Sequence, residues 1–436
     1  MSWEAKPLRE ILDQSGRDRA GNQDLPVLSI TMRHGLVDQA EKFKKRVASS
    51  DTSSYRIAYK NELVVGFPID EGVIGFQTKY PAGIVSPAYD VWRLKNAGGC
   101  HIPYLERYLR SSQARSLYAL RMQGAVARRR SLTKADFLAL EVPFPSLDHQ
   151  IRIAHLLGKV EGLISKRKLR LQQLDDLLKS AFLEMFGDPV VNPKRWPNLG
   201  LGAALTFMQY GPRFYNESYS AEGTRIVRIT DLNENGDLDF LAMPKLTVTE
   251  EERKKFLLQP GDLIFARTGA TVGKVALIGP NDPPAIAGAY FIVMRFKKTL
   301  APLYVRSVLT SKSVRAIIGE RSRQAAQPNF SGPGLRQLPM PIPPMELQQE
   351  FAELSDKVAN LRAHYQHSLT DLEVLYGALC QQAFKGELDL SRVCMPDTQP
   401  EKAKTVILKS FHTHAEQGLA INLPDTDNLL GALENV

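Results

Sequence analysis

Two short runs of adjacent cations are the residues of this 436-residue chain with the clearest chemical meaning. They are Lys44, Lys45 and Arg46, followed later by Arg128, Arg129 and Arg130. Adjacent cations repel one another, so solvent or phosphate usually stabilises them. We expect both runs to contact the phosphates of a nucleic acid. Ordinary solvated surface charge is the alternative.

A second set of residues mixes cations with aromatic and amide side chains. Its members are Arg213, Tyr215, Arg267, Lys274, Arg323, Gln324, Gln327 and Asn329. Arg, Gln and Asn can form paired hydrogen bonds with the edges of guanine and adenine. For any single amide, a local turn or cap hydrogen bond is the alternative. Together the two sets predict a DNA-binding surface on which cations position the duplex and polar side chains read bases.

Two stretches resemble catalytic motifs, but each lacks a necessary residue. Gly269–Lys274 looks like a phosphate loop, yet its glycines are four apart instead of five, and Val275 replaces the Ser or Thr that holds magnesium. We expect it to turn the chain between two strands. Asn281–Ala285 resembles the Asp/Asn-Pro-Pro-aromatic signature of adenine methyltransferases, but alanine stands where an aromatic ring would stack on the base. We therefore expect no catalytic, cofactor-binding or metal-binding residues in this chain.

The bulk composition is that of a globular protein with a basic surface. The net charge of +9 is uneven: residues 1–141 carry 22 Lys/Arg and 15 Asp/Glu, while residues 191–340 carry 20 and 12. Two basic regions suggest two contacts on a polyanion. The three cysteines are scattered, and no apolar run has the length of a membrane span, so we expect a cytoplasmic protein without disulfides.

Long amphipathic helices are predicted to hold the two basic regions. In residues 143–189, apolar side chains recur at alternating steps of three and four from Ile153 to Met185, the pattern of a coiled-coil seam. Prolines hold the preceding chain extended, and Gly187-Asp188-Pro189 ends the helix. Such a helix needs a partner with a matching apolar stripe.

The partner comes from an internal repeat. A shift of 198 residues aligns the stretch from Pro143 with the stretch from Pro341 without a gap. The preceding segments also repeat, at offsets near 200, with strands expected at Asp90–Leu94 and Phe291–Phe296. Each of these strands is followed by a short amphipathic helix, which is expected from Tyr104 through Arg115 in the first copy and from Tyr304 through Arg315 in the second. The alternative to duplication, which the gapless alignment disfavours, is that the two long helices are unrelated amphipathic helices.

The predicted fold is α+β, with two tandem globular domains separated by two long helices that pack as an antiparallel coiled coil with pseudo-two-fold symmetry. The expected divisions are a first domain at 1–142, a long helix at 143–189, a second domain at 190–340, a long helix at 341–388 and a tail of unknown role at 389–436.

This layout resembles the specificity (S) subunit of type I restriction–modification systems. The resemblance rests on the two-fold arrangement and on two motifs, Phe182–Pro189 and Gly261–Gly273, and covers about residues 1–390. It implies that each domain is a target-recognition domain that reads one half of a split DNA site, with the halves about one helical turn apart. It also implies two methyltransferase (M) subunits that use S-adenosylmethionine, and restriction (R) subunits that use ATP with magnesium.

Three other functions stay open at this point. One is a self-contained nuclease or methyltransferase, which incubation with DNA and S-adenosylmethionine would reveal. Another is a coiled-coil scaffold that binds no DNA, which salt-dependent binding of a random duplex would exclude. The third is a specificity subunit that serves a methyltransferase-only or fused nuclease–methyltransferase system.

Overall fold

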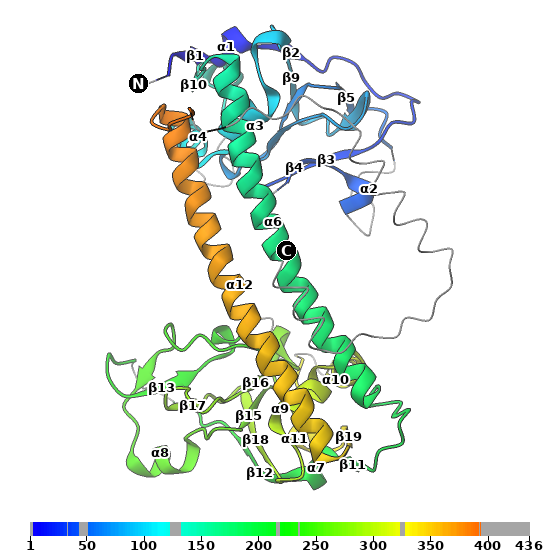
Figure 1. The fold of residues 1–436 in the computed structure, drawn as a ribbon. Helices are drawn as coiled ribbons and strands as arrows, with labels where there is room; N and C mark the ends of the chain where they lie inside the picture. The colour runs from blue at the N-terminus through cyan, green and yellow to red at the C-terminus, as the bar shows by residue number, and fades with distance from the viewer. Residues whose placement is uncertain are drawn as a thin grey trace. The chain divides into compact units, whose positions relative to one another are not determined.

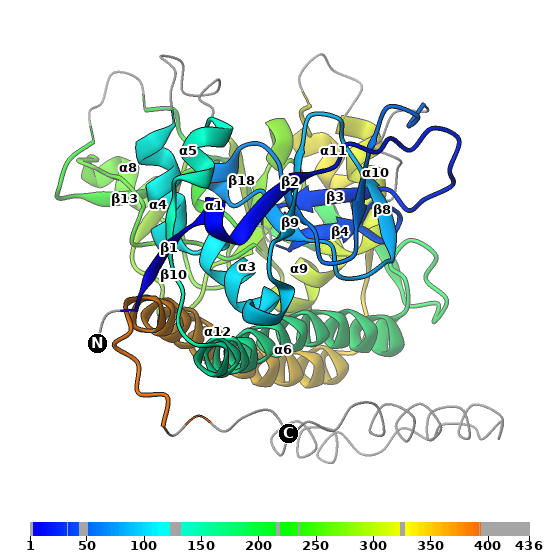
Figure 2. The ribbon, with the colours of Figure 1, turned by 90° about the horizontal axis from the view of Figure 1, so that it is seen from above.

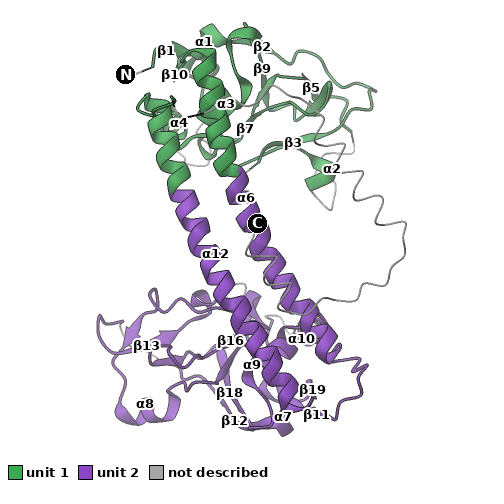
Figure 3. Ribbon diagram, viewed as in Figure 1, with its two compact units in different colours: residues 1–161, 375–436 green, residues 162–374 purple. Residues whose placement is uncertain are grey.

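The computed structural model describes residues 3–32, 34–42, 51–122, 132–214, 219–233, 236–322, 328–391 and 393. Two compact units can be distinguished (Figure 3): residues 1–161 with 375–436, and residues 162–374. Each unit therefore contains one globular region and segments of both long helices, so the contacts do not follow the linear division of the sequence. In the described part of the chain, no helix is both long and apolar enough to cross a bilayer.

The first unit combines helices and strands (Figure 1). Its helices, besides the segments of the two long ones, are α1 (Leu8–Ile11), α2 (Gln39–Lys42), α3 (Ile102–Arg110), α4 (Ser112–Arg121) and α5 (Lys134–Leu138). Its strands are β1 (Ala5–Pro7), β2 (Leu12–Ser15), β3 (Leu28–Thr31), β4 (Gly35–Asp38), β5 (Arg56–Tyr59), β6 (Leu63–Val65), β7 (Ile74–Phe76), β8 (Ala82–Val85), β9 (Asp90–Leu94) and β10 (Glu141–Pro143).

The second unit has the same kinds of element. Its shorter helices are α7 (Leu201–Ala204), α8 (Glu250–Phe256), α9 (Pro302–Thr310), α10 (Lys312–Ser322) and α11 (Gly332–Arg336). Its strands are β11 (Asn198–Gly200), β12 (Leu205–Tyr210), β13 (Thr224–Val227), β14 (Lys245–Leu246), β15 (Leu263–Ala266), β16 (Val275–Leu277), β17 (Ala285–Ala287), β18 (Phe291–Phe296) and β19 (Pro339–Pro341). The predicted mixture of helix and sheet is confirmed.

The strand order shows the internal repeat directly. The four-stranded sheet of the first unit has the order β2-β9-β6-β7, and that of the second has the order β12-β18-β15-β16. Leu63 pairs with Trp92 and Phe76 in the first sheet, and Leu263 pairs with Met294 and Leu277 in the second. Equivalent leucines thus lie at the centre of two sheets with the same antiparallel register.

A buried glutamine joins each long helix to its neighbouring domain in the same way. Gln150 accepts a hydrogen bond from the His101 amide at 2.8 Å and donates to the Pro145 carbonyl at 2.9 Å. Gln348, 198 residues later, accepts from the Ala301 amide at 2.8 Å and donates to the Pro343 carbonyl at 2.9 Å. Both side chains are fully buried, so these hydrogen bonds satisfy polar groups that water cannot reach.

The two long helices, α6 (Leu147–Phe186) and α12 (Met345–Lys385), contact each other within the second unit. Their apolar contact includes Leu174, Val358 and Tyr365. Three pairs give the direction: Lys168–Glu373 at 2.8 Å, Asp175–Arg362 at 3.8 Å, and Phe182–Phe351 with ring centroids 5.6 Å apart. As residue numbers rise along α6 they fall along α12, so the segments in this unit are antiparallel.

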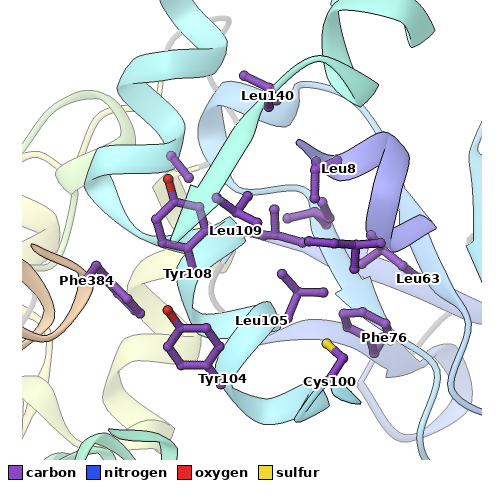
Figure 4. Close-up of a cluster of buried hydrophobic side chains, with 14 of the residues drawn as sticks. Leu8, Leu63, Phe76, Cys100, Tyr104, Leu105, Tyr108, Leu109, Leu140 and Phe384 are labelled. Atoms are coloured by element: carbon purple, nitrogen blue, oxygen red, sulfur yellow. The ribbon is translucent and has the colours of Figure 1, made fainter. Parts of the chain in front are cut away.

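In the first unit, the end of α12 completes the core (Figure 4). The ring of Phe384 lies 5.8 Å from that of Tyr104 and 5.2 Å from that of Tyr108, beside Leu105 and Leu109. Helix α3 lies against α6 (Figure 2), where Arg107 and Glu161 form a 2.6 Å ion pair. Both long helices therefore contribute residues to the folding of this unit.

One predicted boundary was wrong, and its cause is local. The long helices begin at Leu147 and Met345, after the prolines that were expected to keep the preceding chain extended, and Pro143 and Pro341 end short strands. The single short helix expected after Tyr104 is two helices, α3 and α4, since the Ser111 side chain accepts a hydrogen bond from the Ala114 amide and caps a new helix. The second unit repeats this break between α9 and α10.

Candidate nucleic-acid interface

Of the fourteen predicted DNA-binding residues, four lie in the described part of the chain: Arg213, Arg267, Lys274 and Asn329. The other ten are outside the described residues: Lys44, Lys45, Arg46, Arg128, Arg129, Arg130, Tyr215, Arg323, Gln324 and Gln327. All four described residues belong to the second unit.

Two of these four, Arg267 and Asn329, are brought together. Strand β15 is a fully buried apolar strand, and Arg267 is the first residue after it. The Arg267 amide donates to the Tyr290 carbonyl, and the Arg267 carbonyl accepts from the Phe330 amide. Thr268 and Asn329 then form an isolated antiparallel bridge. The backbone on both sides of Arg267 is therefore fixed by hydrogen bonds to distant parts of the sequence.

Two neighbours hold the guanidinium of Arg267: the ring of Tyr210 lies against one face of its plane, and Asn329 contacts one edge. The Arg267 Cζ atom lies 4.7 Å from the centre of the Tyr210 ring, within the range of a cation–π interaction. Its Nη2 donates to Asn329 Oδ1 at 3.3 Å. Tyr210 is fixed in turn, because its hydroxyl accepts a hydrogen bond from the Gly332 amide at 2.9 Å. The arrangement points a planar donor group in a defined direction.

Lys274 and Arg213 are linked to this site through the backbone. The Lys274 carbonyl accepts a hydrogen bond from the Ala266 amide at 2.9 Å, which places Lys274 opposite the end of β15. Gly269–Lys274 turns the chain between the antiparallel strands β15 and β16, as predicted. Arg213 is exposed and follows β12, the strand that ends at Tyr210.

Two tyrosines at this site were not among the predicted contacts. Tyr210 is 41% exposed and Tyr290 is 57% exposed, although each adjoins a strand of the sheet. A large aromatic residue at the end of a strand, with its ring in solvent, is a signal for a binding surface.

The first unit has different chemistry at the equivalent place. When Leu63 is aligned with Leu263, Phe67 is the equivalent of Arg267; it is the second residue after β6, and its side chain is 57% exposed. The same sheet therefore presents an apolar ring in one unit and a cation in the other. Two domains with one scaffold and different surface residues are suited to contacting two different ligands or sequences.

Several partly or fully buried titratable groups belong to the scaffold. Asp262 is fully buried and accepts two hydrogen bonds from Arg295, at 2.6 and 3.0 Å. Burial raises the pKa of Glu106, against the opposing influence of Arg110. Burial also raises the pKa of Cys100 to about 12, so this thiol stays protonated. Among the described residues, no three His, Cys, Asp or Glu side chains are grouped as a metal site requires.

Comparison with known proteins identifies the type of domain to which these residues belong. Residues 214–371 match the family model described as "Type I restriction modification DNA specificity domain". Over 280 residues the chain is 24% identical to the specificity subunit of the type I restriction enzyme EcoKI from Escherichia coli (strain K12), covering 59% of this chain. It is 22% identical over 248 residues, 52% of the chain, to the MjaVIII specificity subunit from Methanocaldococcus jannaschii. The aligned regions span 60% and 57% of these relatives, less than two thirds of each.

Solved structures share the fold. A crystal structure described as the S subunit of a type I restriction–modification system from M. genitalium has a TM-score of 0.53 at 14% identity, over 88% of this chain and 96% of that one. A chain from a study of the assembly of the type I R-M system has a TM-score of 0.51 at 16% identity, over 89% and 98%. The resemblance found in the sequence is confirmed.

Proposed function

We propose that this chain, which contains a type I restriction–modification DNA specificity domain at residues 214–371, is the DNA-recognition subunit of such a system. Each unit binds one half of a bipartite DNA site. The observation that carries this proposal is the pair of sheets with one strand order and different residues after the equivalent strand, the half-buried Arg267 and the exposed Phe67. An asymmetric split site needs two similar readers that differ in the side chains they present.

The two long helices connect the readers in this proposal. They form an antiparallel coiled coil along their length, which sets the spacer between the half-sites. The antiparallel pairing in the second unit supports this role. The chain itself is non-catalytic and binds no cofactor. Two M subunits would dock on it and methylate adenine N6 with S-adenosylmethionine, and R subunits that use ATP and magnesium would join them.

The basic residues contribute affinity in two ways. The runs Lys44–Arg46 and Arg128–Arg130, together with Arg213 and Lys274, contact phosphates and position the duplex. Arg267 and Asn329, with Tyr215, Arg323, Gln324 and Gln327, contact base edges or the sugar–phosphate backbone beside them.

Selection from a randomised duplex library tests the proposal. The full-length chain is incubated with the library at low salt, bound duplexes are sequenced, and their affinity is measured against increasing salt. We expect a consensus of two unlike short sequences separated by a spacer of fixed length, with affinity that falls as salt rises. Binding without a consensus, or no binding at low salt, contradicts DNA recognition by this chain.

A further inference from the structure

The side chain of Arg267 is held at the surface of the second unit, although the sheet does not require it. The first unit builds the same four-stranded sheet with Phe67 at the equivalent position. Strand β6 still pairs with both neighbours in the same register, without an arginine after it. The pairing of this sheet therefore does not require an arginine at this position.

Arg295 shows what an arginine with a structural role looks like in the same sheet. It lies in β18, over the ring of Phe207, and its Nε and Nη2 both donate to the buried carboxylate of Asp262. Arg267 has the aromatic partner but no carboxylate. Among the described residues its side chain makes one hydrogen bond, from Nη2 to Asn329. Its Nε has no acceptor but is buried, so Nη1 and the second hydrogen of Nη2 are the donors that can reach a ligand. Part of its donor capacity thus remains for a ligand.

The orientation of the guanidinium limits which ligand fits. Tyr210 covers one face of the plane and Asn329 holds one Nη2 hydrogen, so an in-plane edge is available. Restricting this long side chain before binding reduces the entropy lost in the complex. A planar group with two adjacent acceptors complements that edge, and the O6 and N7 atoms of guanine in the major groove are such a group.

We propose that Arg267 reads a guanine in the half-site bound by the second unit, with Tyr210 and Asn329 as its positioning residues. This inference depends on the proposed DNA-recognition function. A contact with phosphate uses the same hydrogen-bond donors but carries no base preference, so base preference separates the two.

The test uses the consensus duplex of the full-length chain with 7-deazaguanine at each guanine in turn, which removes N7 and leaves pairing intact. Losing the whole paired contact, as in Arg267→Ala, should lower affinity for the unmodified duplex about 5- to 150-fold. At one guanine of one half-site, 7-deazaguanine should lower wild-type affinity by a smaller factor, because O6 is retained, and it should cause no further loss in Arg267→Ala. Arg253→Ala, the same charge change on α8 of the same unit, should leave base preference unchanged.

Three results would overturn the inference. One is wild-type binding that tolerates 7-deazaguanine at every position, a measurement that does not depend on the folding of any variant. Another is an Arg267→Ala variant that weakens all sequences equally, which indicates a phosphate contact or a structural role. The third is an unchanged consensus in that variant. If the wild-type chain selects no consensus, the proposed function fails first and this inference fails with it.

Discussion

At the scale of single residues, buried polar side chains hold the scaffold and exposed ones differ between the repeats. Gln150 and Gln348 make equivalent hydrogen bonds in the two units, whereas Phe67 and Arg267 occupy equivalent positions with different chemistry. This division explains how one fold can serve two recognition tasks: the shared contacts fix the backbone, and the exposed side chains are free to change.

Gln348→Ala is predicted to destabilise the second unit by about 2–4 kcal/mol. The substitution leaves the Ala301 amide and the Pro343 carbonyl without their buried partner and opens a small cavity. Urea unfolding followed by far-UV circular dichroism measures the change. The exposed Gln366→Ala on α12 is the control and should change stability by less than about 0.5 kcal/mol. Equal effects of the two substitutions would contradict this account of the buried glutamine.

Glu106→Gln is predicted to change stability in a pH-dependent way. Burial raises the pKa of Glu106 in the folded chain, and Arg110, Arg107 and Glu161 are the charged groups around it. The folded state therefore binds the proton of the Glu106 carboxyl more tightly than the unfolded state does. The stability that this proton contributes is lost as the pH rises above about 4.5 and through the folded pKa. Glutamine stays neutral, so the variant should gain stability relative to wild type as the pH rises above about 4.5. If the unfolding free energy of the variant minus that of wild type stays constant or falls as the pH rises, burial does not disfavour the charged form of Glu106.

The sequence could predict Arg267 and Asn329 as candidates because their residue types alone suggest base recognition. It could not predict that they lie together, or that Tyr210 supports them. Those contacts depend on the strand order β12-β18-β15, which brings Tyr210 close to a residue 57 positions later. No local pattern encodes that order.

At the scale of elements, sequence patterns predicted the strands and long helices well where the signal was local. Strands at Asp90–Leu94 and Phe291–Phe296 were predicted with their correct bounds. The break at Ser111 was missed because a capping serine can equally lie inside a helix, and the choice depends on how α3 and α4 pack.

Two glycines, one within α6 and one just after it, are predicted to respond in opposite ways to alanine. Gly187 ends the helix with φ +79°, and a Cβ there would lie 2.6 Å from Cγ of Pro193, so Gly187→Ala should destabilise the chain by about 1–2 kcal/mol or more. Gly162 lies within α6, where an added Cβ would meet no atom of a neighbouring element within 4 Å, so Gly162→Ala should stabilise the helix by about 1 kcal/mol. Thermal unfolding of both variants measures the difference, and the same sign for both would refute the assigned helix end.

At the scale of the whole molecule, the proposed recognition of a split site depends on duplication and charge. Residues 1–141 and 191–340 both carry a basic excess, and each contributes one copy of the four-stranded sheet. The duplication could be predicted from the sequence because the long helices align without a gap. The way in which each unit incorporates segments of both helices could not, since it depends on tertiary contacts such as that of Phe384 with Tyr104.

Replacing Arg128, Arg129 and Arg130 together with alanine is predicted to weaken binding to all duplexes and to flatten its salt dependence. Each phosphate contact that is lost should reduce the slope of log affinity against log salt by about 1. Fluorescence anisotropy with the consensus duplex and a scrambled duplex at several salt concentrations measures both effects. An unchanged slope would remove this run from the interface.

The central claim is that two similar domains independently read the two halves of one DNA site. Its most direct test is to replace residues 191–340 with the corresponding domain of another specificity subunit and to select bound duplexes from a randomised library. We predict a consensus in which one half changes completely while the other half and its orientation are retained. A change in both halves, or in neither, would contradict the claim.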